Sequence, residues 1–448
     1  MDTRARVASL LSKEISTYRT RTPRSMELYS RASAAMPLGV ASSFQVAEPY
    51  PVYLSHGSGS TVEDIDGNRY IDYHNGFGTM VVGHAHPAIQ AAITRAAASG
   101  THFACTTDEV VRLAEELNRR FGMEQVRFCS TGTEATMDAV RLARAAAGRD
   151  LVVKVEAAYH GHHDALMYSV RSTLDALERA EDAWAVPSSR GIPSGIAAYT
   201  KTVPFNDVAA LERLFDAYPE QIGAVIVEPI MMNAGIILPA PGYLEAVKEL
   251  CRARGAVLIF DEVKTGVTVA PGGATELFGV QPDLICLAKA IGGGTPIGAF
   301  GGTAAVMSEL GKGVAGQGTF NGNPLSVAAS LATLTEVLTP AAYEHLAALG
   351  TRLATGCAKV LEHAGIAAHT TDLGCKGSIT FSSRPLARYD DYRHVDGSLF
   401  DAYWFWMVNR GIFVTPGKEE QWTISVQHTD EDIDRTIEML EAYCAEVA

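Results

Sequence analysis

The sequence has few of the features that mark secreted, membrane-spanning or nucleic-acid-binding proteins. Its seven cysteines are odd in number and include no Cys-x-x-Cys pair, which argues against a disulfide framework or a thiolate metal site. No apolar run approaches the roughly 20 residues that cross a bilayer, and residues 1–24 lack the apolar core of a signal peptide. Only 37 basic side chains face 51 acidic ones, and a net charge of −14 repels nucleic acid and anionic lipid. We therefore expect a cytoplasmic protein that binds neither nucleic acid nor membrane.

What the chain does contain is the pattern of a large folded α/β protein. Its 448 residues, 47% hydrophobic and 20% charged, suffice for two or three domains with a sizeable core. Between residues 87 and 329, helical patterns alternate with short, continuously apolar runs. These runs are 126–129, 151–155, 224–227, 256–260 and 284–287. Apolar strands separated by helices predict a mostly parallel sheet that is covered on both faces.

The ends of the chain predict a second, smaller α+β domain. Residues 60–73 alternate around Asp66-Gly67 and predict a hairpin. A long helix is expected from Leu331 onward, followed by a thinner strand pattern and a closing helix over 431–446. We predict an N-terminal segment at 1–75, a large domain at 76–330 and a small domain at 331–448.

Polar residues follow several of the apolar runs, where an open α/β sheet binds its ligands. Ser130 to Ala135 turn into a helix, and the free N–H groups of such a helix start suit a phosphate, although an ordinary N-cap has the same pattern. Asp261 ends an apolar run and needs a partner or a turn to cap. Lys289 ends the last run beside three glycines. A poorly hydrated lysine there is a candidate nucleophile, while a structural lysine is the alternative.

A loop with three histidines follows the run at 151–155. His160, His162 and His163 could suggest a metal site, but no Glu or Cys lies at ligand spacing. Tyr159 in the same loop is a better candidate for stacking on a ring. A phosphate site, a stacking tyrosine, a carboxylate for a ring nitrogen and a reactive amine together specify pyridoxal phosphate.

With these motifs the sequence resembles the class III (fold-type I) pyridoxal-phosphate aminotransferases, and within them the glutamate-1-semialdehyde aminomutase branch. The resemblance covers nearly the whole chain. The matching stretches are 62–73, 83–87, 130–136, 159–162, 260–263, 287–294 and 318–324. It implies a large domain with a mixed, mostly parallel sheet, and a smaller α+β domain built from the C-terminus and the N-terminal segment. It also implies a homodimer with active sites shared between subunits.

The resemblance also implies a role for each matching residue. Lys289 forms a Schiff base with the cofactor and shuttles protons, while Asp261 pairs with the pyridinium nitrogen. Tyr159 and Val263 sandwich the ring. The remaining cofactor contacts implied are Thr131, Gly132 and Thr133 at the phosphate, Glu228 and Asn233 near the phenolic oxygen, and Thr319 from the neighbouring subunit.

Departures from the aminomutase pattern bear on the substrate. Gln45 stands where the aminomutase has an arginine that grips the substrate carboxylate, and a neutral amide cannot replace that guanidinium. Phe77 replaces an expected tryptophan, and residues 171–182 form a longer, more charged insert. The candidates for substrate contact or gating are Ser42, Gln45, Phe77, Glu420 and Trp422.

We therefore expect an aminotransferase that moves an amino group from a small amine or amino acid to a keto acceptor through pyridoxamine phosphate. The alternative is an intramolecular aminomutase of the glutamate-1-semialdehyde type. A catalytically silent homologue is disfavoured because Lys289, Asp261 and the phosphate loop occur together. A dinucleotide-dependent oxidoreductase is disfavoured because no Gly-x-Gly-x-x-Gly opens an N-terminal βαβ unit.

Overall fold

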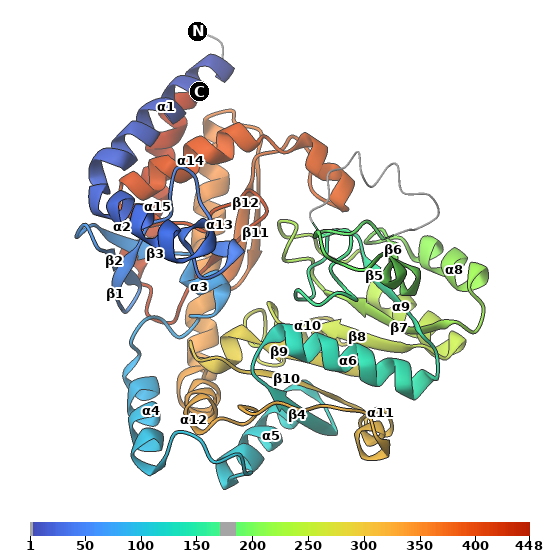
Figure 1. Ribbon diagram of the computed structural model, residues 1–448. Helices are drawn as coiled ribbons and strands as arrows, with labels where there is room; N and C mark the ends of the chain where they lie inside the picture. Colours follow the sequence, from blue (N-terminus) through green and yellow to red (C-terminus); the bar gives the residue numbers. More distant parts are fainter. Residues whose placement is uncertain (1–2, 171–184) are drawn as a thin grey trace. The chain divides into compact units, whose positions relative to one another are not determined.

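We describe the chain from a computed structural model, which covers residues 3–170 and 185–448 (Figure 1). Contacts within the chain divide it into two compact units. The first comprises Met1–His86, Glu344–Arg384 and His394–Ala448, and the second comprises Pro87–Tyr343 and Pro385–Arg393. The limits drawn from the sequence near residues 75 and 330 stay a prediction.

The second unit is built on a seven-stranded sheet. Its strand order is β4 (Gln125–Cys129), β10 (Gly298–Gly302), β9 (Leu284–Ala288), β8 (Val257–Asp261), β7 (Ile222–Val227), β5 (Leu151–Val155) and β6 (Thr200–Val203). The pairs from β9 to β6 are all parallel. Every residue of β5, β7, β8 and β9 is buried, because these strands have helices on both faces. The predicted α/β architecture is confirmed.

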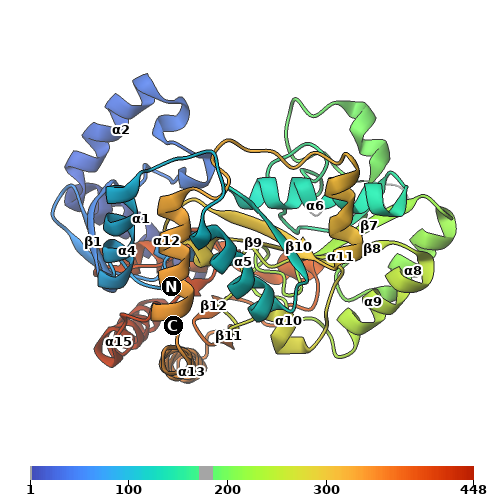
Figure 2. The same cartoon turned by 90° about the horizontal axis from the view of Figure 1, so that it is seen from below.

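Helices lie on both faces of this sheet (Figure 2). The helices of the second unit are α4 (Pro87–Ser99), α5 (Asp108–Phe121), α6 (Gly132–Ala147), α8 (Val208–Ala217), α9 (Tyr243–Arg254), α10 (Gly273–Phe278), α11 (Ala304–Met307) and α12 (Pro324–Ala332). Helix α6 lies on one face, with α9 and α10 on the other. Small residues of α6 such as Ala135 and Ala139 let it pack closely on Ile226 and Cys286 in one buried cluster.

Strand β10 is the sheet's antiparallel member and lies between β4 and β9. The sequence pattern does not predict this strand, because three glycines among five residues give Gly298–Gly302 little strand propensity. The glycines are needed for close approach. A Cβ at Gly298 would lie 2.5 Å from the Thr131 carbonyl oxygen, and one at Gly302 would overlap the Asp283 carbonyl oxygen.

The prediction of one continuous helix from Leu331 is wrong, because the structure has two helices there with a break between them. Helix α12 passes into a wider π-type turn at Thr333–Val337, and α13 (Pro340–His363) then begins anew. Pro340 has no amide N–H to continue the helix, and its ring disfavours a helical residue before it.

The first unit contains two smaller sheets and helices from both ends of the chain. One sheet has the order β1 (Leu54–Ser58), β2 (Thr61–Asp64), β3 (Arg69–Asp72) and β13 (Ile412–Phe413), and the other has β11 (His369–Leu373), β12 (Lys376–Thr380) and β14 (Trp422–Thr423). The helices are α1 (Thr3–Arg21), α2 (Pro23–Ala35), α3 (Asn75–Gly78), α14 (Gly397–Asn409) and α15 (Asp430–Val447). Strands β2 and β3 form the predicted hairpin around Asp66-Gly67.

Within the part of the chain that the structure describes, no single helix has the length and apolar character to cross a membrane. One bent pair of helical segments, Pro324–Val337 with Pro340–His363, is long and apolar enough by length and composition alone.

Lys154 is a fully buried lysine in β5 and gives the fold a testable pH dependence. Its Nζ donates to the carbonyl oxygens of Ala158, at 2.7 Å, and Tyr168, at 2.5 Å. Burial lowers the pKa of Lys154 to about 7, against the opposing effect of the nearby carboxylates of Glu228 and Glu156.

We expect this group to make the protein more stable as the pH rises from 7 to 10. Between the folded pKa near 7 and the ordinary value of 10.5, the unfolded chain binds more protons at Lys154 than the folded chain. Thermal unfolding midpoints at matched cofactor loading should therefore gain less over this interval in Lys154→Met than in the wild type. Identical pH profiles for the two proteins would contradict the expectation.

Candidate active site

The candidate site lies along one edge of the seven-stranded sheet. Strands β4, β8 and β9 end at the same edge, because each runs antiparallel to β10 or parallel to a strand that does. The residues at or directly after these ends are Ser130, Asp261 and Lys289. The structure thus brings three of the predicted site segments to one edge of one unit.

The predicted phosphate loop is the N-terminus of α6. The Thr131 side chain accepts from the Glu134 backbone N–H at 3.2 Å, and Glu134 Oε2 in turn accepts from the N–H groups of Ser130 and Thr131. This capping box leaves the backbone N–H groups of Gly132 and Thr133 without hydrogen-bond partners among the described residues. The segment is therefore a capped helix start that also offers two backbone donors, and the phosphate site stays a prediction.

Gly132 allows this helix start to come close to β8 and β9. A Cβ on Gly132 would lie 3.0 Å from Val263 Cγ1 and 3.5 Å from the Cβ of Ala288. The nearby Thr133 hydroxyl accepts from the His162 backbone N–H at 3.3 Å. Thr131, Gly132, Thr133 and Val263 are therefore neighbours, as predicted for groups that share one ligand.

Asp261 has both of the partners that the sequence left as alternatives. Its Oδ1 accepts from the Val263 backbone N–H at 3.0 Å, which caps the turn after β8. Its Oδ2 lies 2.7 Å from Nδ1 of His160, and both side chains are buried. The other ring nitrogen of His160, Nε2, is buried with no partner among the described residues.

His160 lies in the candidate site, although the sequence pattern does not single it out. The sequence places it in a histidine-rich loop, and its position next to Tyr159 is the one local signal for this role. His162 is exposed, and burial together with the nearby cations lowers the pKa of His163 to about 3, so that it is neutral near pH 7. The described residues contain no group of three or more His, Cys, Asp or Glu side chains placed to hold a metal ion.

Glu228, directly after β7, is hydrogen-bonded to Tyr159, the residue predicted to stack on the ring. Its Oε1 accepts from the Tyr159 backbone N–H at 2.9 Å and from Asn233 Nδ2 at 3.0 Å. Its Oε2 accepts from the Met232 N–H at 2.8 Å. Three residues predicted as cofactor contacts, Tyr159, Glu228 and Asn233, thus form one buried or half-buried cluster.

Lys289 is held in an unusual backbone conformation at the end of β9. Its φ of +51° lies in the left-handed region, which costs a residue with a side chain of this size roughly 1–3 kcal/mol. The residue is half-buried and begins a short turn, Lys289–Gly292. Such strained positions persist where the surrounding structure enforces them, and they concentrate at functional sites.

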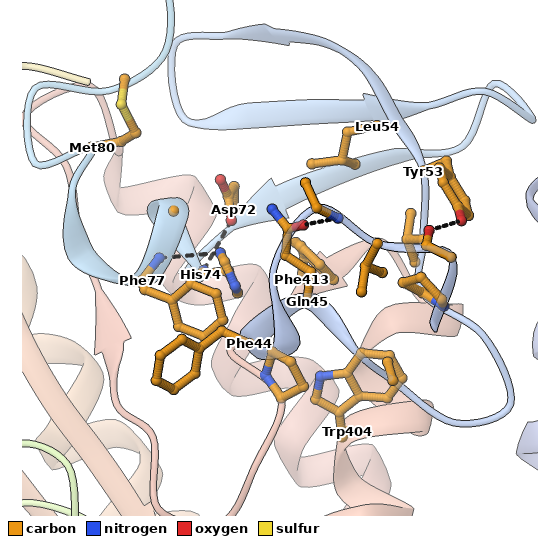
Figure 3. Close-up of a pocket in the computed structure, with 18 of the residues that line it drawn as sticks. Phe44, Gln45, Tyr53, Leu54, Asp72, His74, Phe77, Met80, Trp404 and Phe413 are labelled. Carbon is orange, nitrogen blue, oxygen red and sulfur yellow. Dashed lines mark hydrogen bonds between the residues drawn. The ribbon is translucent and has the colours of Figure 1, made fainter. Parts of the chain in front are cut away.

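The substrate candidates all lie in the other unit. Gln45 Oε1 accepts from the backbone N–H groups of Ala41, at 3.1 Å, and Ser42, at 3.2 Å. Gln45 and Phe77 line one cavity (Figure 3). Glu420 is buried and accepts from Gln421 Nε2 at 2.8 Å.

Three further predictions concern Trp422, Thr319 and the insert at 171–182. Trp422 is buried in β14, where it packs so closely that Gly377 has no room for a Cβ. Thr319 is exposed on the loop before α12. The insert lies outside the described residues.

The residues at the sheet edge suit a phosphorylated ring aldehyde. The paired free N–H groups at α6 can hold a phosphate, and Gly132 lets this helix start lie close to Val263. The buried Asp261 carboxylate can accept from a ring N–H, and the amine of Lys289 can react with an aldehyde. The donor set therefore fits pyridoxal phosphate.

Comparison with known proteins agrees with this chemistry. The profile described as "Aminotransferase class-III" matches residues 43–386. A protein of Brevibacillus brevis named glutamate-1-semialdehyde 2,1-aminomutase 2 is 40% identical over 421 residues, which is 93% of this chain and 96% of that protein.

Solved structures with the same fold include transaminases. An omega-transaminase from Sphaerobacter thermophilus superposes with a TM-score of 0.89 at 33% identity, covering 94% of this chain and 97% of that one. A transaminase with PLP bound gives a TM-score of 0.86 at 32% identity, covering 95% and 98%. The expected fold-type I architecture is confirmed, and the chain belongs to the class-III aminotransferase family, whose cofactor is pyridoxal phosphate.

Proposed function

We propose that this protein is an intermolecular aminotransferase, which takes an amino group from a small amine and delivers it to a separate carbonyl acceptor. The observation that supports it most strongly is the set of groups at one sheet edge: the free N–H groups of α6, the buried Asp261 carboxylate and the half-buried Lys289 amine. These groups come from β4, β8 and β9, so no rearrangement of the sheet is needed to use them together.

Pyridoxal phosphate, when bound, would supply an aldehyde carbon and an electron-withdrawing ring. The N–H groups of Gly132 and Thr133 would hold its phosphate. Asp261, oriented by His160 and by the Val263 N–H, would keep a proton on the ring nitrogen. The amine of Lys289 would hold the cofactor and would move a proton to and from the substrate α-carbon.

The environment of Gln45 favours transfer between two molecules over an aminomutase reaction on one. By resemblance the aminomutase uses an arginine here to grip a carboxylate, whereas Gln45 is neutral and its amide oxygen is already bonded to two backbone N–H groups. The aminomutase remains the second candidate, because the Brevibacillus brevis relative that is 40% identical carries that name.

The first test is the absorption spectrum of the purified protein, before and after borohydride, followed by peptide mapping. We expect a yellow protein that bleaches on reduction and carries the cofactor covalently on Lys289. A colourless protein that takes up no pyridoxal phosphate would overturn the proposal.

The second test separates the two candidate reactions by stoichiometry. An aminotransferase should release one keto product per enzyme from an amine donor and then stop, and added pyruvate as acceptor should restore turnover. Sustained turnover of glutamate-1-semialdehyde alone would instead identify the aminomutase.

We also propose a homodimer in which Thr319 of one subunit contacts the phosphate bound by the other. The exposed position of Thr319, on a loop that also exposes Phe320, supports this arrangement. Sedimentation velocity of the holoprotein should give twice the mass of 47.8 kDa. A monomer that binds the cofactor at full occupancy would rule the arrangement out.

A further inference from the structure

The second unit contains two buried lysines and a buried glutamate next to the candidate site. Lys154 lies in β5, Glu228 lies directly after β7, and Lys264 lies in the turn after β8. Charged side chains are rarely buried to this degree unless other groups stabilise their charge. The proposed reaction uses neither lysine, so both call for another explanation.

The peptide group between Ala158 and Tyr159 is held from both sides. Its carbonyl oxygen accepts from Lys154 Nζ at 2.7 Å, and its N–H donates to Glu228 Oε1 at 2.9 Å. A cation at the oxygen and an anion at the N–H both match the dipole of the peptide group. Lys154 Nζ also donates to the Tyr168 carbonyl oxygen at 2.5 Å. The backbone that leads into Tyr159 is therefore fixed by two side chains of opposite charge.

The backbone of Met232 is held in a similar way on the other side of Glu228. The Met232 N–H donates to Glu228 Oε2 at 2.8 Å, and the Met232 carbonyl oxygen accepts from Lys264 Nζ at 3.2 Å. The next residue, Asn233, donates from Nδ2 to Glu228 Oε1 at 3.0 Å. Each lysine is thus joined to Glu228 through a backbone segment that the carboxylate also binds.

Charge also couples the members of this network, Lys154, Glu228 and Lys264. Burial lowers the pKa of Lys154, and the carboxylate of Glu228 opposes that change, so the two charges stabilise each other. In a buried network of this kind, removing one member leaves the charge of the others uncompensated. The three side chains should therefore behave as a unit when one of them is replaced.

The network joins segments that carry predicted cofactor contacts. Tyr159 and His160 follow the peptide group that Lys154 holds, and His160 Nδ1 lies 2.7 Å from Asp261. Lys264 directly follows Val263, whose N–H donates to Asp261 Oδ1 at 3.0 Å. The network therefore connects residues 158–160, 228–233 and 261–264, all of which belong to the second unit.

We propose that Lys154 and Lys264 are positioning residues, which act through Glu228 to hold Tyr159 and Asn233 in place around the ring of the cofactor. The proposal rests on the proposed function, because the ring belongs to bound pyridoxal phosphate. Neither lysine reacts with the cofactor or the substrate. Their role is to keep two contact residues in one geometry, on which the rate of the reaction depends.

The test compares Glu228→Gln and Lys264→Met with the wild-type holoprotein, since both replacements remove a charge and nearly keep the side-chain volume. The signal is the induced circular dichroism of the visible cofactor band, expressed per bound cofactor, which needs no turnover. We expect each variant to lower this signal about twofold or more and kcat about tenfold to a hundredfold. A merely structural role would lower the unfolding midpoint and leave the signal per bound cofactor unchanged.

Three further variants show whether the residues act together. The double variant Glu228→Gln/Lys264→Met should lose no more signal than Glu228→Gln alone, because either change already breaks the network. Lys264→Arg keeps the charge and should recover about half or more of the signal lost in Lys264→Met. Lys312→Met removes an exposed lysine of the same unit and should leave the signal unchanged.

The outcomes separate this proposal from the proposed function. A Lys289 adduct together with an unchanged signal in either single variant would overturn the proposal alone. Additive losses in the double variant would also overturn it, since Lys264 would then act independently of Glu228. If Lys264→Met does not fold, Lys154→Met with its own Glu228→Gln double variant gives the same comparison. Absence of the Lys289 adduct would overturn the function and the proposal together.

Discussion

Replacing Lys289 with alanine should lower turnover by at least about 10⁴-fold, because the change removes both the nucleophile and the group that moves the proton at the substrate α-carbon. The fold should survive. Alanine relieves the side-chain strain of the left-handed φ only in part, but the strand before it is completely buried and makes its own hydrogen bonds. Single-turnover and steady-state rates of the purified variant measure the loss.

The matched control is Lys312→Ala. Lys312 is an exposed lysine of the same unit and pairs at the surface with Glu309, so its removal should leave the rate near that of the wild type. The Lys289→Ala protein should still absorb as a cofactor complex but yield no borohydride adduct. A variant with more than a hundredth of the wild-type rate would refute the assignment of Lys289.

Asp261→Asn should lower kcat by about 10³-fold or more while the protein remains folded and loaded with cofactor. The amide keeps the shape of the carboxylate and can still accept from the Val263 N–H, but it carries no charge to keep the ring nitrogen protonated. Stopped-flow rates of the half-reaction with an amine donor are the appropriate measurement. Retained activity would mean that another acid serves the ring.

His160→Phe offers a graded comparison at the same place. It keeps an aromatic ring of similar size but removes the Nδ1 that lies 2.7 Å from Asp261, so the carboxylate loses one of the two hydrogen bonds that orient it. We expect a smaller loss, about tenfold to a hundredfold. The pH at which the bound cofactor changes its absorption should also move, which a purely structural role of His160 would not cause.

The parts of the candidate site that could be predicted from the sequence are residues at the end of a single strand. Asp261 and Lys289 each follow a continuously apolar run, and a charge in that position needs a chemical reason. The Thr131 cap and the glycine after it are likewise local signals. These residues needed only the assignment of the strands, which periodicity supplied.

The parts that could not be predicted depend on residues distant in the chain. The pairing of His160 with Asp261 spans 101 positions. Ring contacts likewise join Phe44 to Phe77, and Phe77 through His74 to Phe413. Neither contact has a local pattern. Strand β10 could not be predicted for a local reason. Its three glycines allow close packing but lower the strand propensity of the segment.

The crowding around β10 also predicts how the protein tolerates change. In a saturation-mutagenesis library, Gly298 and Gly302 should be almost as intolerant as Lys289, although neither bears a functional group, because any side chain there meets neighbouring backbone. Gly195 and Gly311 have ordinary φ values and open space around them, so they should accept many residues. A map of tolerated substitutions would thus show β10 as clearly as it shows the residues of the candidate active site. Directed evolution toward new amines should therefore leave the glycines of β10 unchanged.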